Sequence, residues 1–127
     1  MARIKGIITE DDKILIDGYL FKDNIKLEPS FVIDADFTGY DLAIPADIAA
    51  RLNLNPSRIV SVITAAGPVK LKAGENLYIS LGNKIYKASY IIYYGSINII
   101  SISFLKSISE IIIIDLINRH VTIILLW

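Results

Sequence analysis

The residues best suited to chemistry lie together in one short segment of the chain. This segment runs Asp34-Ala35-Asp36-Phe37-Thr38-Gly39. The apolar run 31–33 comes directly before it, so a short strand would deliver the Asp34 carboxylate to a tight loop. Carboxylates in proteins serve as general acids and bases or as ligands of hard cations. These are the two kinds of chemistry that the segment offers.

A calcium-binding loop is one interpretation of this segment. Asp34, Asp36 and Thr38 place oxygen atoms at alternate positions, and a glycine follows them. The twelfth position of such a loop needs a bidentate glutamate, but the chain has Pro45 there. No helix is predicted before Asp34. The spacing therefore disfavours calcium, and the sequence predicts no metal site.

Other candidate residues have less support from their surroundings. His120 is the single histidine of the chain, and no partner for it is visible, so we expect it at the surface or half-buried. Ser101 and Ser103 lack the glycines that flank a nucleophilic serine. The tyrosines of segment 90–94 could form a binding stripe, but packing in the strand core or at an interface is the preferred interpretation.

The elements around the segment are mostly short strands. Strands are predicted at residues 3–9, 13–22, 31–33, 41–44, 58–64, 68–81, 84–94, 111–115 and 120–125. Pro45 suits a helix start, and Ile48 and Leu52 then lie on one face of a helix over 46–52. Residues 104–108 are the candidate for a second short helix. This pattern predicts one mainly all-β domain over residues 1–127, built as a closed β-barrel with one or two short helices.

The order of these elements resembles the active-site region of retropepsin-like aspartic proteases, the single-domain relatives of pepsin. The similarity is to the prokaryotic type, whose signature is Asp-Thr-Gly-Phe-x-Gly, a short apolar strand, Pro, and a helix that ends Leu-Gly-Leu. The residues that match this register are Asp34, Phe37, Thr38, Gly39, Leu42, Ile44, Pro45, Leu52 and Leu54.

Further segments match in the same order. Residues 99–105 follow the apolar segment that leads into a short helix, and residues 114–122 follow the terminal hairpin with its Val-Thr strand. The family places its flap where this chain has Ala65-Ala66-Gly67-Pro68. The resemblance therefore covers about residues 3 to 125.

The resemblance implies a homodimer in which each chain supplies half of the active site. Asp34 would be the catalytic carboxylate, in a loop completed by residues 35–39. Two such carboxylates held close together share one proton, so one activates water and the other polarises the scissile carbonyl. The flap would close over an extended peptide or protein substrate. No cofactor is expected.

Three positions depart from the family pattern. Ala35 stands where members have Thr or Ser, Asp36 stands where they have Gly, and Ser101 replaces a glycine behind the loop. Alanine cannot make the hydroxyl hydrogen bond, and Asp36 adds a carboxylate beside the pair. The leading interpretation is an aspartic endopeptidase, and the alternative is a catalytically inactive member that serves as a dimerising or peptide-binding module. An unrelated structural β-barrel is a third possibility.

The composition excludes several classes of function. Lys and Arg number 13 and so do Asp and Glu, so the chain lacks the cationic surplus of a nucleic-acid binder. Cysteine is absent, which excludes disulfides and a cysteine nucleophile. Isoleucine occurs 27 times and glutamine not at all. That usage hints at a thermophile, although an AT-rich genome gives the same bias.

The longest uncharged stretch lies between Lys87 and Lys106 and has 18 residues, near the lower limit for a membrane span. It contains serine, asparagine and glycine, whose polar groups are costly in a bilayer, so two strands around a turn at 94–96 are expected instead. The start of the chain shows no signal peptide. We therefore expect no membrane span and a cytoplasmic location. The apolar end, residues 121–127, would need cover, which also favours a dimer.

Overall fold

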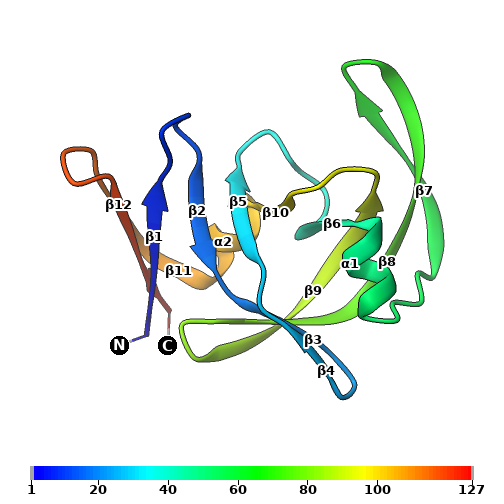
Figure 1. Ribbon diagram of the computed structural model, residues 1–127, viewed down its shortest axis with the longest axis horizontal. Helices are drawn as coiled ribbons and strands as arrows, with labels where there is room; N and C mark the ends of the chain where they lie inside the picture. The colour runs from blue at the N-terminus through cyan, green and yellow to red at the C-terminus, as the bar shows by residue number, and fades with distance from the viewer. Residues whose placement is uncertain (1, 127) are drawn as a thin grey trace.

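The computed structural model describes residues 2–126 and contains, within them, one twelve-stranded sheet and two short helices (Figure 1). The strands are β1 (Arg3–Ile8), β2 (Ile14–Asp17), β3 (Tyr19–Lys22), β4 (Ile25–Leu27), β5 (Ser30–Asp34), β6 (Leu42–Pro45), β7 (Arg58–Thr64), β8 (Gly67–Leu81), β9 (Lys84–Tyr93), β10 (Asn98–Ser101), β11 (Ser109–Asp115) and β12 (His120–Leu125). The helices are α1 (Ala46–Arg51) and α2 (Ile102–Ile108). The predicted fold class, mainly β with short helices, is confirmed.

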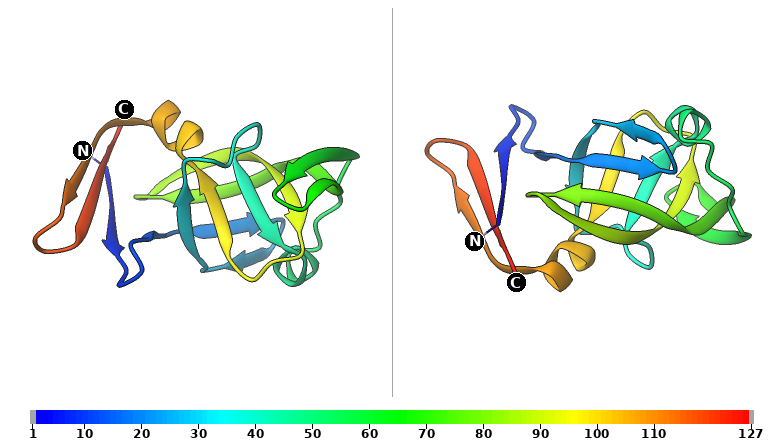
Figure 2. Two further views of the ribbon diagram at one scale, coloured as in Figure 1. Left: turned by 90° about the horizontal axis from the view of Figure 1, so that it is seen from above. Right: turned by 90° about the horizontal axis from the view of Figure 1, so that it is seen from below.

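The sheet is not closed, so the prediction of a closed barrel is wrong in this respect. Its strand order is β11-β12-β1-β2-β5-β10-β6-β9-β8-β3-β4. The strands at the two ends of this order, β11 and β4, do not pair with each other. Strand β7 lies off this path because β8, fifteen residues long, pairs with β7 over one part and with β3 over another. Figure 2 shows that the terminal strands, β1 and β12, and the β7–β8 hairpin lie at opposite ends of the molecule.

One predicted strand is in fact two. Residues 13–22 were expected to be continuous, but β2 ends at Asp17 and β3 begins at Tyr19. The break falls at Gly18, where an added Cβ would meet a Leu81 side-chain carbon at 2.8 Å and the Ser80 carbonyl oxygen at 3.1 Å. Glycine is needed because the chain passes this close to β8 while changing its pairing partner.

Helix α1 lies where it was predicted, and the predicted residues start and end it. Pro45 is its N-cap residue, where the missing N–H has no cost. Leu52 is fully buried beneath the helix end. Asn53 then takes a left-handed conformation with φ of 52°, which ends the helix. The helix thus connects β6, next to the candidate site, with the hairpin that begins at Arg58.

The core has two parts. The larger cluster lies inside the sheet and includes the fully buried side chains of Phe31, Tyr90 and Leu105. Ile4 and Ile123, from the first and last strands, belong to the same cluster. The smaller cluster centres on Ala43, Leu71, Ala73 and Ile91. It joins the β7–β8 hairpin to the segment that follows Asp34, so it bears directly on the candidate site.

Among the described residues, no helix is long and apolar enough to cross a membrane. The uncharged stretch between Lys87 and Lys106 folds as most of β9, a turn, β10 and the start of α2. The expected arrangement of two strands around a turn is therefore confirmed.

Candidate functional site

Asp34 ends β5, a strand in the middle of the sheet. Strand β5 is hydrogen-bonded to β2 on one side and runs parallel to β10 on the other, where Ser101 lies opposite Asp34. The Asp34 side chain is half-buried, and its Oδ1 accepts a hydrogen bond from the Asp36 main-chain N–H at 2.9 Å. The strand and this hydrogen bond together fix the direction of the carboxylate.

The loop after Asp34 exposes most of its side chains. Ala35, Asp36, Thr38 and Gly39 are exposed, and Gly39 has a φ of 90° that favours glycine. The hydrogen bond to Asp34 uses the main chain of Asp36, which a residue of another type would also supply. This hydrogen bond therefore does not depend on the Asp36 side chain.

A pair of side chains that the sequence analysis missed anchors the end of this loop. Asp41 Oδ2 accepts from the Ser89 N–H at 2.9 Å, and Ser89 Oγ accepts from the Asp41 N–H at 3.0 Å. The Asp41 carbonyl also accepts from the Ser101 N–H at 3.0 Å. Asp41 thus ties the loop to β9 and to the strand opposite Asp34. No local motif signals this pair, because its members are 48 residues apart.

The four residues predicted as a flap lie at the tip of the β7–β8 hairpin (Figure 1). Thr64 Oγ1 donates to the Gly67 carbonyl at 2.8 Å and accepts from the Ala66 N–H at 3.2 Å, so the turn is well defined. Gly67 has a φ of 110°. Ala65, Ala66 and Pro68 are exposed. The tip is therefore an exposed turn joined to the protein only through its two strands.

One face of this hairpin contacts the loop that follows Asp34. Val60 and Val62 of β7 pack against the smaller cluster, and Phe37 and Tyr40 of the loop pack against the same cluster. The Arg58 guanidinium also lies over the Tyr40 ring, 5.7 Å from its centroid. Asp34, the loop that follows it and the hairpin are therefore parts of one connected region.

Ser101 has a structural use that explains its presence. It is buried, with 1% of its surface exposed, and its Oγ accepts from the Phe104 N–H at 3.0 Å as the N-cap of α2. Since Ser101 lies opposite Asp34, this cap also fixes the strand end beside the carboxylate. Ser103 is exposed on the same helix.

The remaining candidates lie apart from this region. His120 is exposed, as expected, and faces Asp115 and Ile7 across neighbouring strands. The hydrogen bonds that Asp115 accepts from Asn118 hold the pKa of its carboxyl below the ordinary value. Within residues 2–126, no three His, Asp or Glu side chains gather as a metal site would require.

The tyrosines do not form one stripe. Tyr90 is buried in the core, Tyr93 is half-buried, and Tyr94 is 92% exposed. Burial raises the pKa of Tyr90 and of Tyr93. Core packing accounts for Tyr90, as the preferred interpretation expected, whereas Tyr94 faces solvent.

Comparison with known proteins supports a fold assignment. The arrangement of strands and helices is a retropepsin-like fold. A solved structure with this arrangement is the retropepsin-like aspartic protease from Rickettsia conorii, with a TM-score of 0.71 and 20% sequence identity. The match covers 95% of this chain and 89% of that chain. The resemblance inferred from the sequence is thus confirmed for the fold. No protein-family model and no curated protein matches the chain.

Proposed function

We propose that this chain is one half of a homodimeric aspartic endopeptidase with Asp34 as its catalytic carboxylate. The observation that carries the proposal is the setting of Asp34 in a retropepsin-like fold. It ends a central strand, is half-buried, and has one oxygen held by a main-chain N–H at 2.9 Å. Its other carboxylate oxygen accepts no hydrogen bond from another residue among those described here.

The proposed chemistry needs two copies of Asp34 across a twofold axis. Two carboxylates held close together cannot both be charged at low cost, so the pair shares one proton. The charged member takes a proton from water, which attacks the peptide carbonyl carbon. The protonated member polarises the carbonyl oxygen, and the leaving amine receives a proton as the C–N bond breaks.

The hairpin and the smaller cluster would position the substrate. Phe37, Tyr40, Val60 and Val62 are partly exposed apolar side chains beside the loop. They offer apolar surface for the side chains of an extended peptide, whose main chain would form hydrogen bonds with strand edges. The exposed tip at residues 65–68 is suited to close over that peptide and exclude water.

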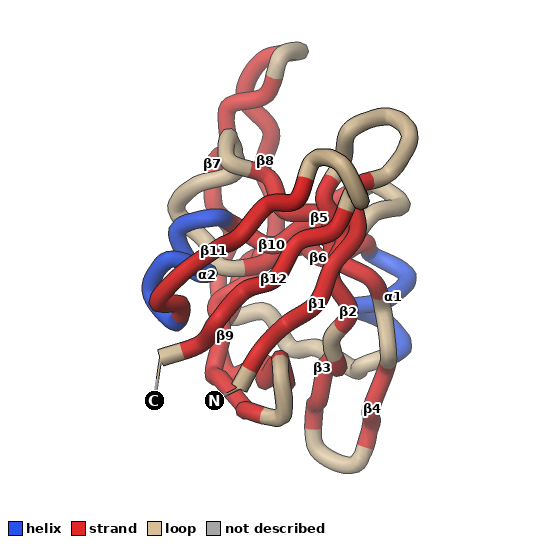
Figure 3. The backbone as a smooth tube through the Cα atoms, turned by 90° about the vertical axis from the view of Figure 1, so that its left-hand side faces the viewer, coloured by secondary structure: helices blue, strands red, loops and turns tan. Residues whose placement is uncertain are grey.

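The outer strand β11 supports the homodimer. Within residues 2–126, β11 pairs only with β12, so its other edge has free N–H and C=O groups (Figure 3). Ile111, Ile113 and Ile114 on this strand are 48 to 50% exposed. A free edge that also carries large apolar side chains is prone to aggregate unless another chain covers it. A second copy of this chain would provide that cover.

The decisive test compares peptide-library cleavage by the native chain and Asp34→Asn from about pH 3 to about pH 7. We expect the native protein to cleave and Asp34→Asn to lose about 10²- to 10⁴-fold in rate, since the amide cannot take or give the proton. Asp23→Asn is the matched control, because Asp23 is exposed in the turn between β3 and β4, outside the candidate site. It should retain most of the activity.

Two results would contradict the proposal. Equal activity in Asp34→Asn would show that another residue performs the cleavage. No cleavage by a folded native dimer would favour the inactive, peptide-binding alternative. In that case Ala35→Thr combined with Asp36→Gly would test whether these two departures from the family pattern removed the activity.

A further inference from the structure

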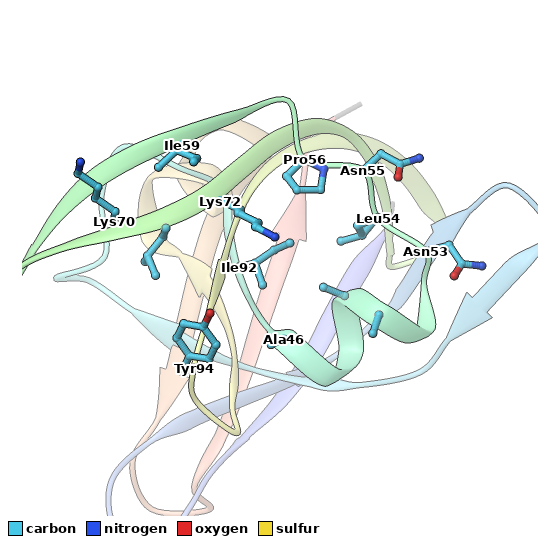
Figure 4. Close-up of a pocket in the computed structure, with 13 residues that line it drawn as sticks. Ala46, Asn53, Leu54, Asn55, Pro56, Ile59, Lys70, Lys72, Ile92 and Tyr94 are labelled. Atoms are coloured by element: carbon cyan, nitrogen blue, oxygen red, sulfur yellow. The ribbon is translucent and has the colours of Figure 1, made fainter.

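A hollow of about 600 Å³ lies between helix α1 and the hairpin, on a side of the molecule that the proposed function does not use (Figure 4). We call it the outer-flap hollow. Helix α1 contributes Ala46 and Ala50, and the segment after it contributes Leu54. The hairpin contributes Ile59 and Lys72. Its size is within the range of about 300–1,000 Å³ typical of small-molecule sites.

The strand register places the exposed hairpin side chains of this hollow on one face of the hairpin, while Leu71, a member of the smaller cluster, also lines it. Ile59 pairs with Lys72, and both line the hollow. Side chains alternate between the two faces of a strand, so Val60 and Val62 point the other way. They pack against the smaller cluster, as do Phe37 and Tyr40 of the loop that follows Asp34. A molecule in the hollow would therefore contact mainly the hairpin face that carries Ile59 and Lys72, and it would also meet Leu71.

The charged residues that line the hollow are all cationic. Lys70 and Lys72 line it, and no Asp or Glu is among its lining residues. Both lysines are exposed, and neither forms an ion pair within the described chain. Figure 4 shows the Lys72 side chain directed over the hollow toward Ile92, with Lys70 at one end. The flexible lysine stem allows either ammonium group to reach a bound anion.

The rest of the lining is apolar with a few neutral polar groups. Ile59 is 68% exposed here and offers apolar surface to a bound molecule. Asn53 and Asn55 lie at one side and Tyr94 at another (Figure 4). An apolar floor under unpaired cations is complementary to a molecule with a hydrocarbon body and a negative head.

We propose that the outer-flap hollow is a binding site for a small amphipathic carboxylate. The aliphatic body would lie on Ile59, Leu54 and Ile92, and the carboxylate would accept hydrogen bonds from the Lys72 or Lys70 ammonium group. Binding of this kind requires no peptidase activity, so the test of this site does not depend on the proposed function.

The test titrates decanoate, below its micellar concentration, into the native protein by isothermal calorimetry at low ionic strength. We expect one molecule bound per chain, with affinity that falls as salt is added. The Lys70→Gln, Lys72→Gln double variant should bind about fivefold more weakly or worse, because it lacks both charged donors. Decanol should bind more weakly than decanoate. Lys87→Gln, an exposed lysine of β9 outside the hollow, is the matched control and should bind normally.

A second variant tests the location of the site. Ala50→Glu places a carboxylate at an exposed, helix-compatible position of the lining, and it should abolish decanoate binding while the protein stays folded by circular dichroism. Amide shifts in NMR spectra should centre on Ile59 and Ile92 in the native protein. Undetectable binding by the native chain would overturn the proposal, as would binding that survives both variants or equal binding of decanol.

Discussion

At the residue scale, Ser101 connects the candidate catalytic region with the helix that follows it. Its N–H donates to the Asp41 carbonyl, and its Oγ accepts from the Phe104 N–H. It also lies opposite Asp34 in the parallel pairing of β5 and β10. Glycine at this position would leave the first turn of α2 without a side-chain cap. The serine therefore adds local order beside the carboxylate.

Replacing Ser101 should show this capping role in stability. We expect Ser101→Ala to lower the free energy of unfolding by about 1 kcal/mol, and Ser101→Gly to lower it by only a few tenths, since glycine is tolerated at N-caps. Urea denaturation of both variants gives the two values. A Ser101→Ala protein as stable as the native one would show that the bond to Phe104 contributes nothing.

At the element scale, strand β9 contains several tyrosines whose surroundings change their pKa values. Burial raises the pKa of Tyr86, Tyr90 and Tyr93, all of which belong to this strand. Tyr90 also accounts for an irregularity in β8. An added Cβ at Gly74 would lie 2.5 Å from the Tyr90 hydroxyl oxygen, and the pairing of β8 with β9 shifts register between Gly74 and Leu77.

These tyrosines should make the protein sensitive to alkali. A pKa that is higher in the folded state than in the unfolded state contributes stability below the unfolded value, about 10, and this stability is lost as pH rises through the folded value. Phenolate absorbance and circular dichroism followed together should show late ionisation that coincides with unfolding. In Tyr90→Phe, one late phenol should disappear. Ionisation of all three near pH 10 in a folded protein would contradict the expectation.

The sequence predicts elements well where the cause is local. Helix α1 follows from Pro45 and the spacing of Ile48 and Leu52, and the hairpin of β11 and β12 follows from its turn. The break at Gly18 was missed because the alternation of residues continues through it. The pairing of β5 with β10 and the contact of Asp41 with Ser89 join distant segments. Such contacts depend on how the whole sheet assembles, which no local pattern records.

At the scale of the whole molecule, the exposed edge at β11 is the feature that most needs a partner. One edge of β11 is unpaired within the described residues, and several isoleucines on this strand are half-exposed. A homodimer through this edge stays a prediction, as do the thermophilic source suggested by composition and the cytoplasmic location.

A charge on this edge should weaken the dimer. We expect Ile113→Lys to raise the dimer dissociation constant about tenfold or more, because edge lysines oppose strand pairing and the apolar contact is lost. Sedimentation equilibrium measures the change. Ile63→Lys is the matched control, since Ile63 is 86% exposed on β7, at the opposite end of the molecule from this edge (Figure 2). An unchanged dimer in Ile113→Lys would place the interface elsewhere.

The pairing of β1 with β12 also has a consequence for how the chain acquires its fold. Arg3 lies opposite Ile124, so β1 hydrogen-bonds to a strand that is synthesised much later than β1 itself (Figure 1). Contacts between such distant segments slow folding, because a long loop must close before any bond forms. While the chain is still on the ribosome, β1 has its β2 neighbour but no β12. Its uncovered isoleucines make chaperone binding valuable during that interval.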